Sequence, residues 1–400
     1  MKQKKKKRWT KKRHAVVRNI LNVFLKPYSY IKYGIKVKKF KEQGKRNYLI
    51  LFNHQTAFDQ FFVGMAFRGP VYYVASEDLF SNGWVSSLIR FLVEPIPIKK
   101  QTTDVRAVLD CIKVSREGGT IAIAPEGNRT YSGRTEYINP AIAPLARKLG
   151  IPIALYRLEG GYGVHPRWAD KVRKGKMTGY VSRVVEPEEY AALSDDELYE
   201  LIKKELYVDE STDLKPFYHK KNAEYLERVF YYCPFCKISE FESKNDIVSC
   251  KRCSRKIKYL QTKELSGIGF DFPYRFVSEW YDAQNDYMRS TELDNYKDTK
   301  LYSKKANVFE VIIYKNKKLI EKSADVTLYG DRISVGNLVF PFSEISAVTV
   351  LGRNKLNIYH NKRIYQLKSA KSFNALIFVN SYYRYKNISE GVKNGQFLGL

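Results

Sequence analysis

The sequence has no uncharged apolar run of 18 or more residues, the length that a transmembrane helix requires. This absence excludes a polytopic membrane protein. No small-residue cleavage site follows the first apolar segment, which argues against a secretory signal peptide. The 400 residues, of which 44% are hydrophobic, are instead enough for two to three globular domains with a sizeable core.

Acidic residues are scarce at the start of the chain. Residues 1–50 contain 18 Lys and Arg but a single acid, Glu42, so this arm carries +17 of the net charge of +28. Such a charge calls for an anionic partner, and composition leaves open whether that partner is nucleic acid or an acidic membrane surface.

An apolar stripe lies inside this basic arm. Its side chains recur at helical spacing within residues 15–25, at Val16, Val17, Ile20, Leu21, Phe24 and Leu25. An amphipathic helix with basic flanks is typical of a helix that lies in the bilayer interface, with its Lys and Arg on anionic headgroups. The alternative is a helix that packs on its own domain below a solvated basic tail. We assign residues 1–46 to a basic arm with a membrane-interface helix.

From residue 47, short apolar runs alternate with helical patterns. The pattern predicts strands over residues 48–52, 71–75, 96–98, 120–124 and 151–156, and helices over residues 58–67, 85–93, 105–116 and 141–149. This alternation predicts an α/β domain around a largely parallel sheet, with functional residues on loops at strand ends. We assign residues 47–228 to this domain.

The first candidate loop, residues 53–59, follows a predicted strand and leads into a predicted helix. His54 and Asp59 are five residues apart across the turn, so the carboxylate can fold back onto one imidazole nitrogen and leave the other as a general base. This is the His–Asp half of a catalytic triad without its nucleophile, which suits a substrate that brings its own hydroxyl group. A structural histidine beside an aspartate is the alternative.

The second candidate loop, residues 124–130, follows the predicted strand over residues 120–124. Gly127 lets the backbone approach a ligand, and Arg129 offers a planar fork for a phosphate. Glu126 can orient Arg129 or bind a substrate hydroxyl. An ordinary polar turn is the alternative.

Together the two loops resemble those of the glycerolipid acyltransferases, the lysophosphatidate acyltransferase (PlsC-like) family. The H-x4-D motif of that family matches His54 and Asp59, its PEG-x-R motif matches residues 125–129, and a later apolar proline motif matches residues 151–153. The resemblance covers residues 45–206. Where the family usually has an Arg, Lys100 is the nearest match, and a lysine keeps the charge but loses bidentate recognition of phosphate.

The resemblance implies a mixed sheet flanked by helices and a membrane-associated acyltransferase on the cytoplasmic face, peripheral or monotopic. His54, held by Asp59, would take the proton from the free glycerol hydroxyl of a lysophospholipid as that oxygen attacks the thioester of an acyl donor. With 1-acyl-glycerol-3-phosphate as the acceptor, the product would be phosphatidate. Lys100, Glu126, Gly127 and Arg129 would bind the acceptor, and the donor would be acyl-CoA or an acyl carrier protein thioester.

Four of the five cysteines form two C-x2-C pairs, Cys233 with Cys236 and Cys250 with Cys253, with thirteen residues between the pairs. Such pairs present four thiolates to one tetrahedral ion, as in a zinc ribbon. Because secretion is disfavoured, Zn²⁺ is favoured over two disulfides. The protein fills all four ligand positions, so the expected ion is structural. We assign residues 229–262 to this ribbon.

The remaining sequence predicts a helix and linker over residues 263–303 and a β-rich domain over residues 304–390. Strands are predicted over residues 308–314, 325–328, 332–335, 345–351, 355–360 and 363–367, and a helix over residues 372–383. This order of elements resembles a PH/GRAM-like domain, which could bind lipid headgroups through Arg353, Lys355, Lys362 and Arg363. A scaffold for self-association is the alternative.

Two alternatives to this acyltransferase stay open. One is a catalytically idle adaptor that binds lipid or nucleic acid, although the intact set of His54, Asp59, Glu126 and Arg129 argues against idleness. The other is an acyltransferase that acts on another lyso-acceptor, such as a lysoglycolipid. The expected partners are an anionic membrane surface, the lysophospholipid and the acyl donor, with nucleic acid disfavoured.

Overall fold

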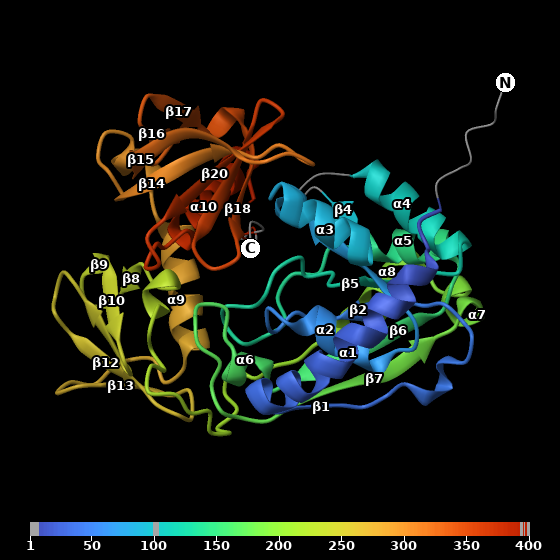
Figure 1. Ribbon diagram of the computed structural model, residues 1–400. Helices are drawn as coiled ribbons and strands as arrows, with labels where there is room; N and C mark the ends of the chain where they lie inside the picture. The colour runs from blue at the N-terminus through green and yellow to red at the C-terminus, as the bar shows by residue number, and fades with distance from the viewer. Residues whose placement is uncertain (1–7, 99–103, 393–394, 396, 398–400) are drawn as a thin grey trace. The chain divides into compact units, whose positions relative to one another are not determined.

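The computed structural model describes residues 8–98, 104–392, 395 and 397. The chain folds into two compact units (Figure 1). The first takes residues up to 128, 135–164 and 174–208, and the second takes residues 129–134, 165–173 and those from 209 onwards.

A seven-stranded sheet lies at the centre of the first unit, in the order β1-β7-β6-β2-β5-β3-β4. Only β6 and β7 pair antiparallel within this sheet, so it is mixed and largely parallel, as the alternating sequence pattern predicted. The strands are β1 (Ile35–Val37), β2 (Leu49–Phe52), β3 (Val71–Ser76), β4 (Ile96–Ile98), β5 (Thr120–Ile123), β6 (Ile153–Glu159) and β7 (Met177–Val185).

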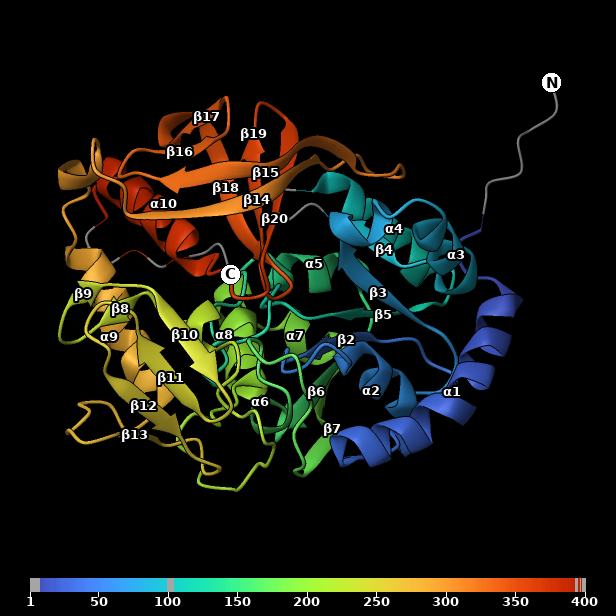
Figure 2. The same cartoon turned by 60° about the vertical axis from the view of Figure 1, so that its left-hand side comes forward.

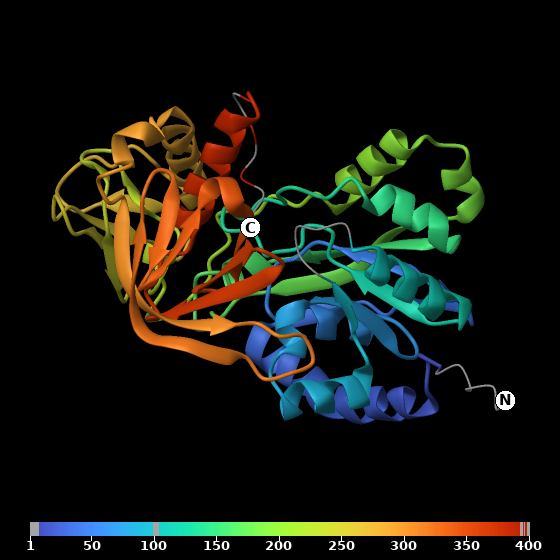
Figure 3. The same cartoon turned by 90° about the horizontal axis from the view of Figure 1, so that it is seen from above.

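Helices cover both faces of this sheet (Figure 3). Leu51 of β2 and Leu155 of β6 belong to a core shared with α4, α5 and α8. Tyr156 points the other way, and its hydroxyl donates to the carbonyl of Phe62 on α2 at 3.4 Å. Successive side chains of a strand face opposite sides, so a strand covered on both faces must be apolar throughout. The helices are α1 (Lys12–Tyr33), α2 (Asp59–Ala66), α3 (Trp84–Val93), α4 (Val105–Arg116), α5 (Ile142–Leu149), α6 (Gly161–Val164), α7 (Pro187–Ala191) and α8 (Asp195–Leu206).

The helix α1 is longer than the predicted stripe and ends at Gly34, whose φ of 61° is the left-handed conformation typical of a helix C-terminus. The stripe divides into two rows: Val17, Leu21 and Leu25 are half-buried, whereas Val16, Ile20 and Phe24 are exposed. Among the described residues, no helix has the length and apolarity that crossing a membrane would demand.

In the second unit, small antiparallel sheets and one helix come first (Figure 2). They are β8 (Tyr232–Cys233) with β9 (Lys237–Ile238), then β10 (Phe241–Lys244), β11 (Ile247–Cys250), β12 (Lys256–Tyr259) and β13 (Leu265–Gly267), followed by α9 (Val277–Ser290). The α9 helix lies within residues 263–303, where a helix and a linker were predicted, and Trp280 on it stacks on Phe230 with ring centroids 3.6 Å apart.

A seven-stranded antiparallel sheet and a C-terminal helix complete the second unit. The strand order is β17-β16-β15-β14-β20-β19-β18, and the helix α10 contacts β18, where the Tyr382 hydroxyl donates to the Ile345 carbonyl at 2.8 Å. The elements are β14 (Tyr302–Glu310), β15 (Lys318–Leu328), β16 (Arg332–Val335), β17 (Leu338–Pro341), β18 (Ile345–Leu351), β19 (Lys355–His360), β20 (Arg363–Ser369) and α10 (Leu376–Ser389).

Three expectations for this sheet were wrong in detail. The strand expected over residues 308–314 instead ends at Glu310, because the chain turns there into the hairpin with β15. The strand β17 was not predicted. The C-terminal helix begins at Leu376 rather than residue 372, because the Asn374 side-chain oxygen accepts hydrogen bonds from the Leu376 and Ile377 N–H groups and starts the helix there.

Candidate active site

The loop between β2 and α2 brings His54 and Asp59 together, as their spacing predicted. The Asp59 Oδ2 lies 2.8 Å from the His54 Nδ1. An ionised carboxylate only accepts hydrogen bonds, so Nδ1 must carry the proton and Nε2 is left with the lone pair. The imidazole side chain is partly exposed.

Asp59 is fully buried at the start of α2, and its carboxylate is enclosed by donors. It accepts from the Gln55 N–H at 2.7 Å, the Thr56 N–H at 2.9 Å and the Thr56 hydroxyl at 2.6 Å. Its place in the first turn of a helix also favours a negative charge. The carboxylate is therefore fixed by its own loop before any substrate binds.

Glu126, in the loop after β5, is half-buried and contacts the histidine loop. Its Oε1 accepts from the His54 N–H at 2.7 Å and its Oε2 accepts from the Glu136 N–H at 3.3 Å. Burial raises the pKa of Glu126 to about 8, although these backbone hydrogen bonds act in the opposite direction. The carboxyl group of Glu126 thus joins the two candidate loops through the backbone of His54.

Residues that the sequence reasoning missed also hold the histidine loop. The Asn53 side chain pairs with the backbone of Leu158 on β6, donating at 2.8 Å and accepting at 2.7 Å. A Cβ atom on Gly161 would lie 2.5 Å from the Cβ of Gln55, so only glycine allows this close approach. The one sequence signal for these contacts was the position of Asn53 in a turn directly before His54. The partners Leu158 and Gly161 lie about a hundred residues further along the chain.

The other predicted acceptor-binding residues are placed differently. Gly127 has a φ of 70°, so the turn of the PEG-x-R motif requires glycine there. Arg129 is buried and belongs to the second unit, whereas Glu126 and Gly127 belong to the first. Lys100 lies outside the described residues.

This geometry can perform general-base catalysis. A partly exposed histidine with a fixed tautomer and a buried carboxylate behind it can remove a proton from a hydroxyl group through Nε2. No nucleophilic side chain is required when the substrate supplies that hydroxyl.

The four paired cysteines form a candidate metal centre in the second unit. Their sulfur atoms all lie within 4.8 Å of one another, with Cys233 Sγ and Cys253 Sγ 3.8 Å apart and Cys236 Sγ and Cys250 Sγ 3.5 Å apart. Tetrahedral zinc–thiolate bonds of about 2.3 Å place the sulfurs about 3.8 Å apart. The cluster therefore fits a Zn²⁺ ion closed to substrate, and all five cysteines of the chain are free thiols.

Arg353, one of the residues expected to bind a lipid headgroup, is engaged inside the second unit. Its guanidinium contacts Asp170 Oδ1 at 2.9 Å and donates to His165 Nε2 at 2.9 Å. Burial lowers the pKa of His165 to about 3, and the guanidinium groups of Arg129, Arg353 and Arg173 add to the effect. His165 is thus a neutral acceptor for the Arg353 guanidinium.

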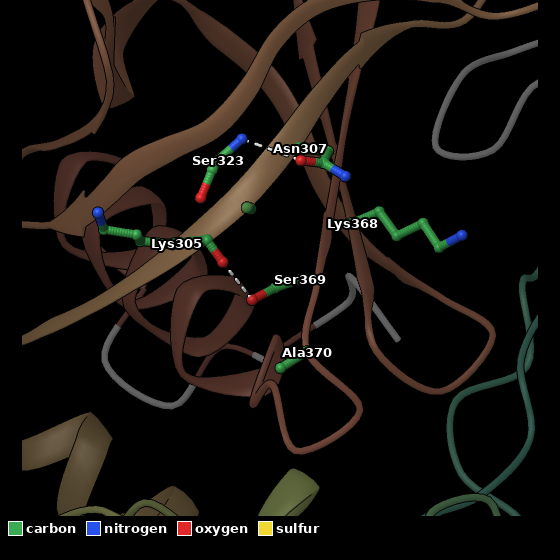
Figure 4. A pocket seen from close by; sticks show the side chains of 7 residues that line it. Lys305, Asn307, Ser323, Lys368, Ser369 and Ala370 are labelled. Carbon is green, nitrogen blue, oxygen red and sulfur yellow. Dashed lines mark hydrogen bonds between the residues drawn. The ribbon is translucent and has the colours of Figure 1, made fainter.

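A shallow polar hollow of about 200 Å³ lies on the C-terminal sheet, lined by Lys305, Asn307, Ser323, Lys368 and Ser369 among others (Figure 4). The side chains of Lys305 and Lys368 extend in opposite directions, and Ser369 donates to the Lys305 carbonyl. The two ammonium groups therefore do not converge on one anion.

Comparison with known protein families identifies one domain. Residues 34–154 match the family model described as Acyltransferase. This range begins at the end of α1 and ends within β6, so it includes both candidate loops.

Among solved structures, the chain is similar to the crystal structure of the 1-acyl-sn-glycerophosphate (LPA) acyltransferase PlsC from Thermotoga maritima. The two share 22% sequence identity with a TM-score of 0.40, over 48% of this chain and 77% of that chain. A comparison with curated proteins gives no match.

Proposed function

We propose, from the match of residues 34–154 to the Acyltransferase family model, that the protein transfers a fatty acyl group to the free glycerol hydroxyl of a lysophospholipid. The proposed acceptor is 1-acyl-glycerol-3-phosphate, the donor is acyl-CoA or an acyl carrier protein thioester, and the product is phosphatidate. The contact between buried Asp59 and His54 Nδ1 is the observation that carries the proposal, because it makes Nε2 a base for a hydroxyl group.

In the proposed reaction, His54 Nε2 takes the proton as the acceptor oxygen attacks the thioester carbonyl. The negative charge of Asp59 stabilises the imidazolium that forms and keeps the ring in place. When the tetrahedral intermediate collapses, the C–S bond breaks, and the imidazolium returns its proton to the leaving thiolate. The acyl group passes directly to the acceptor, so no acyl-enzyme forms.

Arg129 is proposed to bind the acceptor phosphate because a guanidinium offers two parallel N–H donors to an oxyanion. It is three residues along the chain from Glu126, whose carboxyl group contacts the His54 backbone. Chain length alone therefore limits the separation of the Arg129 and Glu126 Cα atoms to about 11 Å. Lys100 remains a proposed second cation for the phosphate.

The proposed test offers the purified protein, in lipid vesicles, lysophosphatidate, other lysophospholipids and a lysoglycolipid with each kind of thioester, and identifies the products by mass. Phosphatidate formed from lysophosphatidate supports the proposal. A product formed only from another acceptor would support the proposed acyl transfer but would replace lysophosphatidate as the proposed acceptor. No acylation with any pair would favour the idle adaptor.

We further propose that the first unit docks on an anionic membrane surface at the cytoplasmic face. Large apolar side chains are exposed on α1 and on the neighbouring helix α3. In addition to the exposed row of α1, Ile31 of α1 is 81% exposed and Trp84 of α3 is 76% exposed. The two helices are in contact, because the Arg13 guanidinium lies 4.2 Å from the centre of the Phe91 ring. Apolar faces flanked by basic residues suit the boundary between headgroups and acyl chains.

Substitution of this face tests the docking proposal. The double variant Phe24→Ser with Trp84→Ser should bind vesicles containing phosphatidate at least ~10-fold more weakly, because two large apolar side chains no longer leave water. The control Tyr218→Ser removes an exposed aromatic of the second unit and should bind as the wild type does. Equal binding by the double variant, measured by vesicle sedimentation, would contradict the proposed face.

We also propose that Cys233, Cys236, Cys250 and Cys253 hold a structural Zn²⁺ ion. Bound there, the ion would cross-link the two cysteine pairs, and it would take no part in the acyl transfer because protein sulfurs fill all four positions.

A further inference from the structure

The segment that carries Arg129 has no helix or strand of its own. Residues 129–134 belong to the second unit, together with residues 165–173 and the chain from residue 209 onwards. A segment without regular backbone hydrogen bonding takes its conformation from the groups that contact it. The contacts of this segment therefore fix the position of the Arg129 backbone, from which its side chain extends.

Arg167 is the first of these contacts and is almost completely buried, with 1% exposed. Its Nη1 donates to the Arg129 carbonyl at 2.9 Å, and its guanidinium lies 4.2 Å from the centre of the Tyr131 ring. On the other side, its Nε donates to the Gly352 carbonyl at 3.3 Å, and its Nη2 donates to the Val350 carbonyl at 3.3 Å. One rigid guanidinium thus joins the Arg129 backbone to the hairpin of β18 and β19.

The helix α9 provides the second set of contacts. The Arg134 Nη2 lies 2.6 Å from Asp282 Oδ1, and the Tyr131 and Tyr281 rings are 6.5 Å apart between centroids. Both rings are buried, so this pairing contributes packing as well as orientation.

The same helix is attached to the cysteine cluster. The Trp280 Nε1 donates to the Tyr232 carbonyl at 2.8 Å, directly before Cys233. The Gln284 side-chain oxygen accepts from the Tyr231 N–H at 2.7 Å. The cysteine cluster is therefore connected through α9 to the segment that carries Arg129.

From these contacts we propose that Arg167 and Asp282 are positioning residues that set Arg129 for the phosphate of the acceptor. The C-terminal half of the chain, rather than being a separate appendage, thereby determines how well the lyso-acceptor binds. This inference rests on the proposed function. Arg167 acts on the backbone of Arg129, and Asp282 acts on the far end of the same segment.

Steady-state kinetics separate positioning from general support of the fold. The variant Asp282→Asn should raise the KM for lysophosphatidate about 3-fold, a small change because a half-exposed ion pair is weak. The kcat and the KM for the acyl donor should change little, because Arg129 would bind the acceptor phosphate equally in the ground and transition states. The variant Arg167→Lys should raise it ~10-fold or more, because one ammonium cannot reach three carbonyls in a fixed plane.

A matched control lies on the same helix. Asp286 pairs with Arg289 at 2.7 Å one turn further along α9, and the structure gives Asp286 no contact with residues 129–134 among those described. The variant Asp286→Asn should leave both KM values unchanged, and its melting temperature should equal that of Asp282→Asn.

Each outcome decides the inference. A higher acceptor KM for Asp282→Asn than for Asp286→Asn supports it. If Arg167→Lys folds poorly, the comparison of these two aspartate variants decides alone. Equal acceptor KM values for the two aspartate variants, with active wild-type protein, would overturn it. Wild-type protein inactive toward every acceptor would instead refute the proposed function, so the two failures are distinguishable.

Discussion

The two candidate loops follow neighbouring strands of one sheet, yet they are held in different ways. In the loop after β2, Asp59 binds the imidazole, two backbone N–H groups and a hydroxyl, all within five residues of itself. The segment after Gly127 has local hydrogen bonds of its own, in which the Thr130 hydroxyl accepts from the Ser132 and Gly133 N–H groups. It is also held by Arg167, by α9 and, through Arg167, by the hairpin of β18 and β19, up to about two hundred residues away.

This difference suggests that separate parts of the proposed enzyme control the chemical step and the binding of the acceptor. A base must stay within hydrogen-bond reach of a proton, and a locally closed loop keeps it there regardless of the rest of the chain. A binding residue held by distant modules can be adjusted by those modules. We therefore expect disturbances of the second unit to change acceptor binding and disturbances of the histidine loop to change the chemical step.

Removal of the proposed zinc ion should have the largest effect and should fall on the second unit. Structural zinc contributes on the order of 10 kcal/mol to small zinc modules, so prolonged chelation should unfold the cysteine modules and release α9 from Tyr232. Near-ultraviolet circular dichroism should lose the signal of Trp280, and the acceptor KM should rise. The control Cys111→Ala, outside the cluster, should keep its zinc. Purified protein without zinc but with full activity would contradict this.

Removal of the proposed base should have the next largest effect. The variant His54→Ala should lose about 10²- to 10⁴-fold in kcat, or roughly 3–5 kcal/mol, because the acceptor hydroxyl loses its general base. The melting temperature should change little, since the imidazole is partly exposed. The control His360→Ala removes a histidine of the C-terminal sheet that pairs with Glu344, and it should keep its activity. A near-normal rate for His54→Ala would sink the assignment of the base.

Local patterns were enough to predict the parts of the molecule whose contacts are local. The strands of the first sheet are apolar on both faces, so they appear in the sequence as continuous runs. The Ser194 capping box that starts α8 is a local contact of the same kind, because its two partners are three residues apart. The contact of His54 with Asp59 and the clustering of the four cysteines also follow from spacing.

Contacts between distant segments were not predictable in this way. Nothing near Asn53 indicates that its amide pairs with Leu158, and nothing near Arg129 indicates that Arg167 holds its carbonyl. The first half of β15, before Asp325, was missed because Leu319 and Ile320 face solvent among lysines, so the usual alternation of apolar and polar residues is absent. The roles of the site residues and the domain boundaries stay predictions.

The smallest expected effect concerns Glu126, which joins the two loops. Its pKa is raised to about 8 in the folded protein, from an ordinary value of 4.5, chiefly by burial. Between these two pH values the unfolded chain releases a proton that the folded chain keeps, so this group makes the protein less stable as pH rises through that window. Glu126→Gln removes the titration but loses one acceptor oxygen, a cost that does not vary with pH. The free energy of unfolding of the variant, measured with denaturant relative to the wild type, should therefore rise between pH 5 and pH 8, by about 1.4 kcal/mol per pH unit at most. A constant difference across this range would show that Glu126 is ionised in the fold, and the two loops would then be joined through a buried charge.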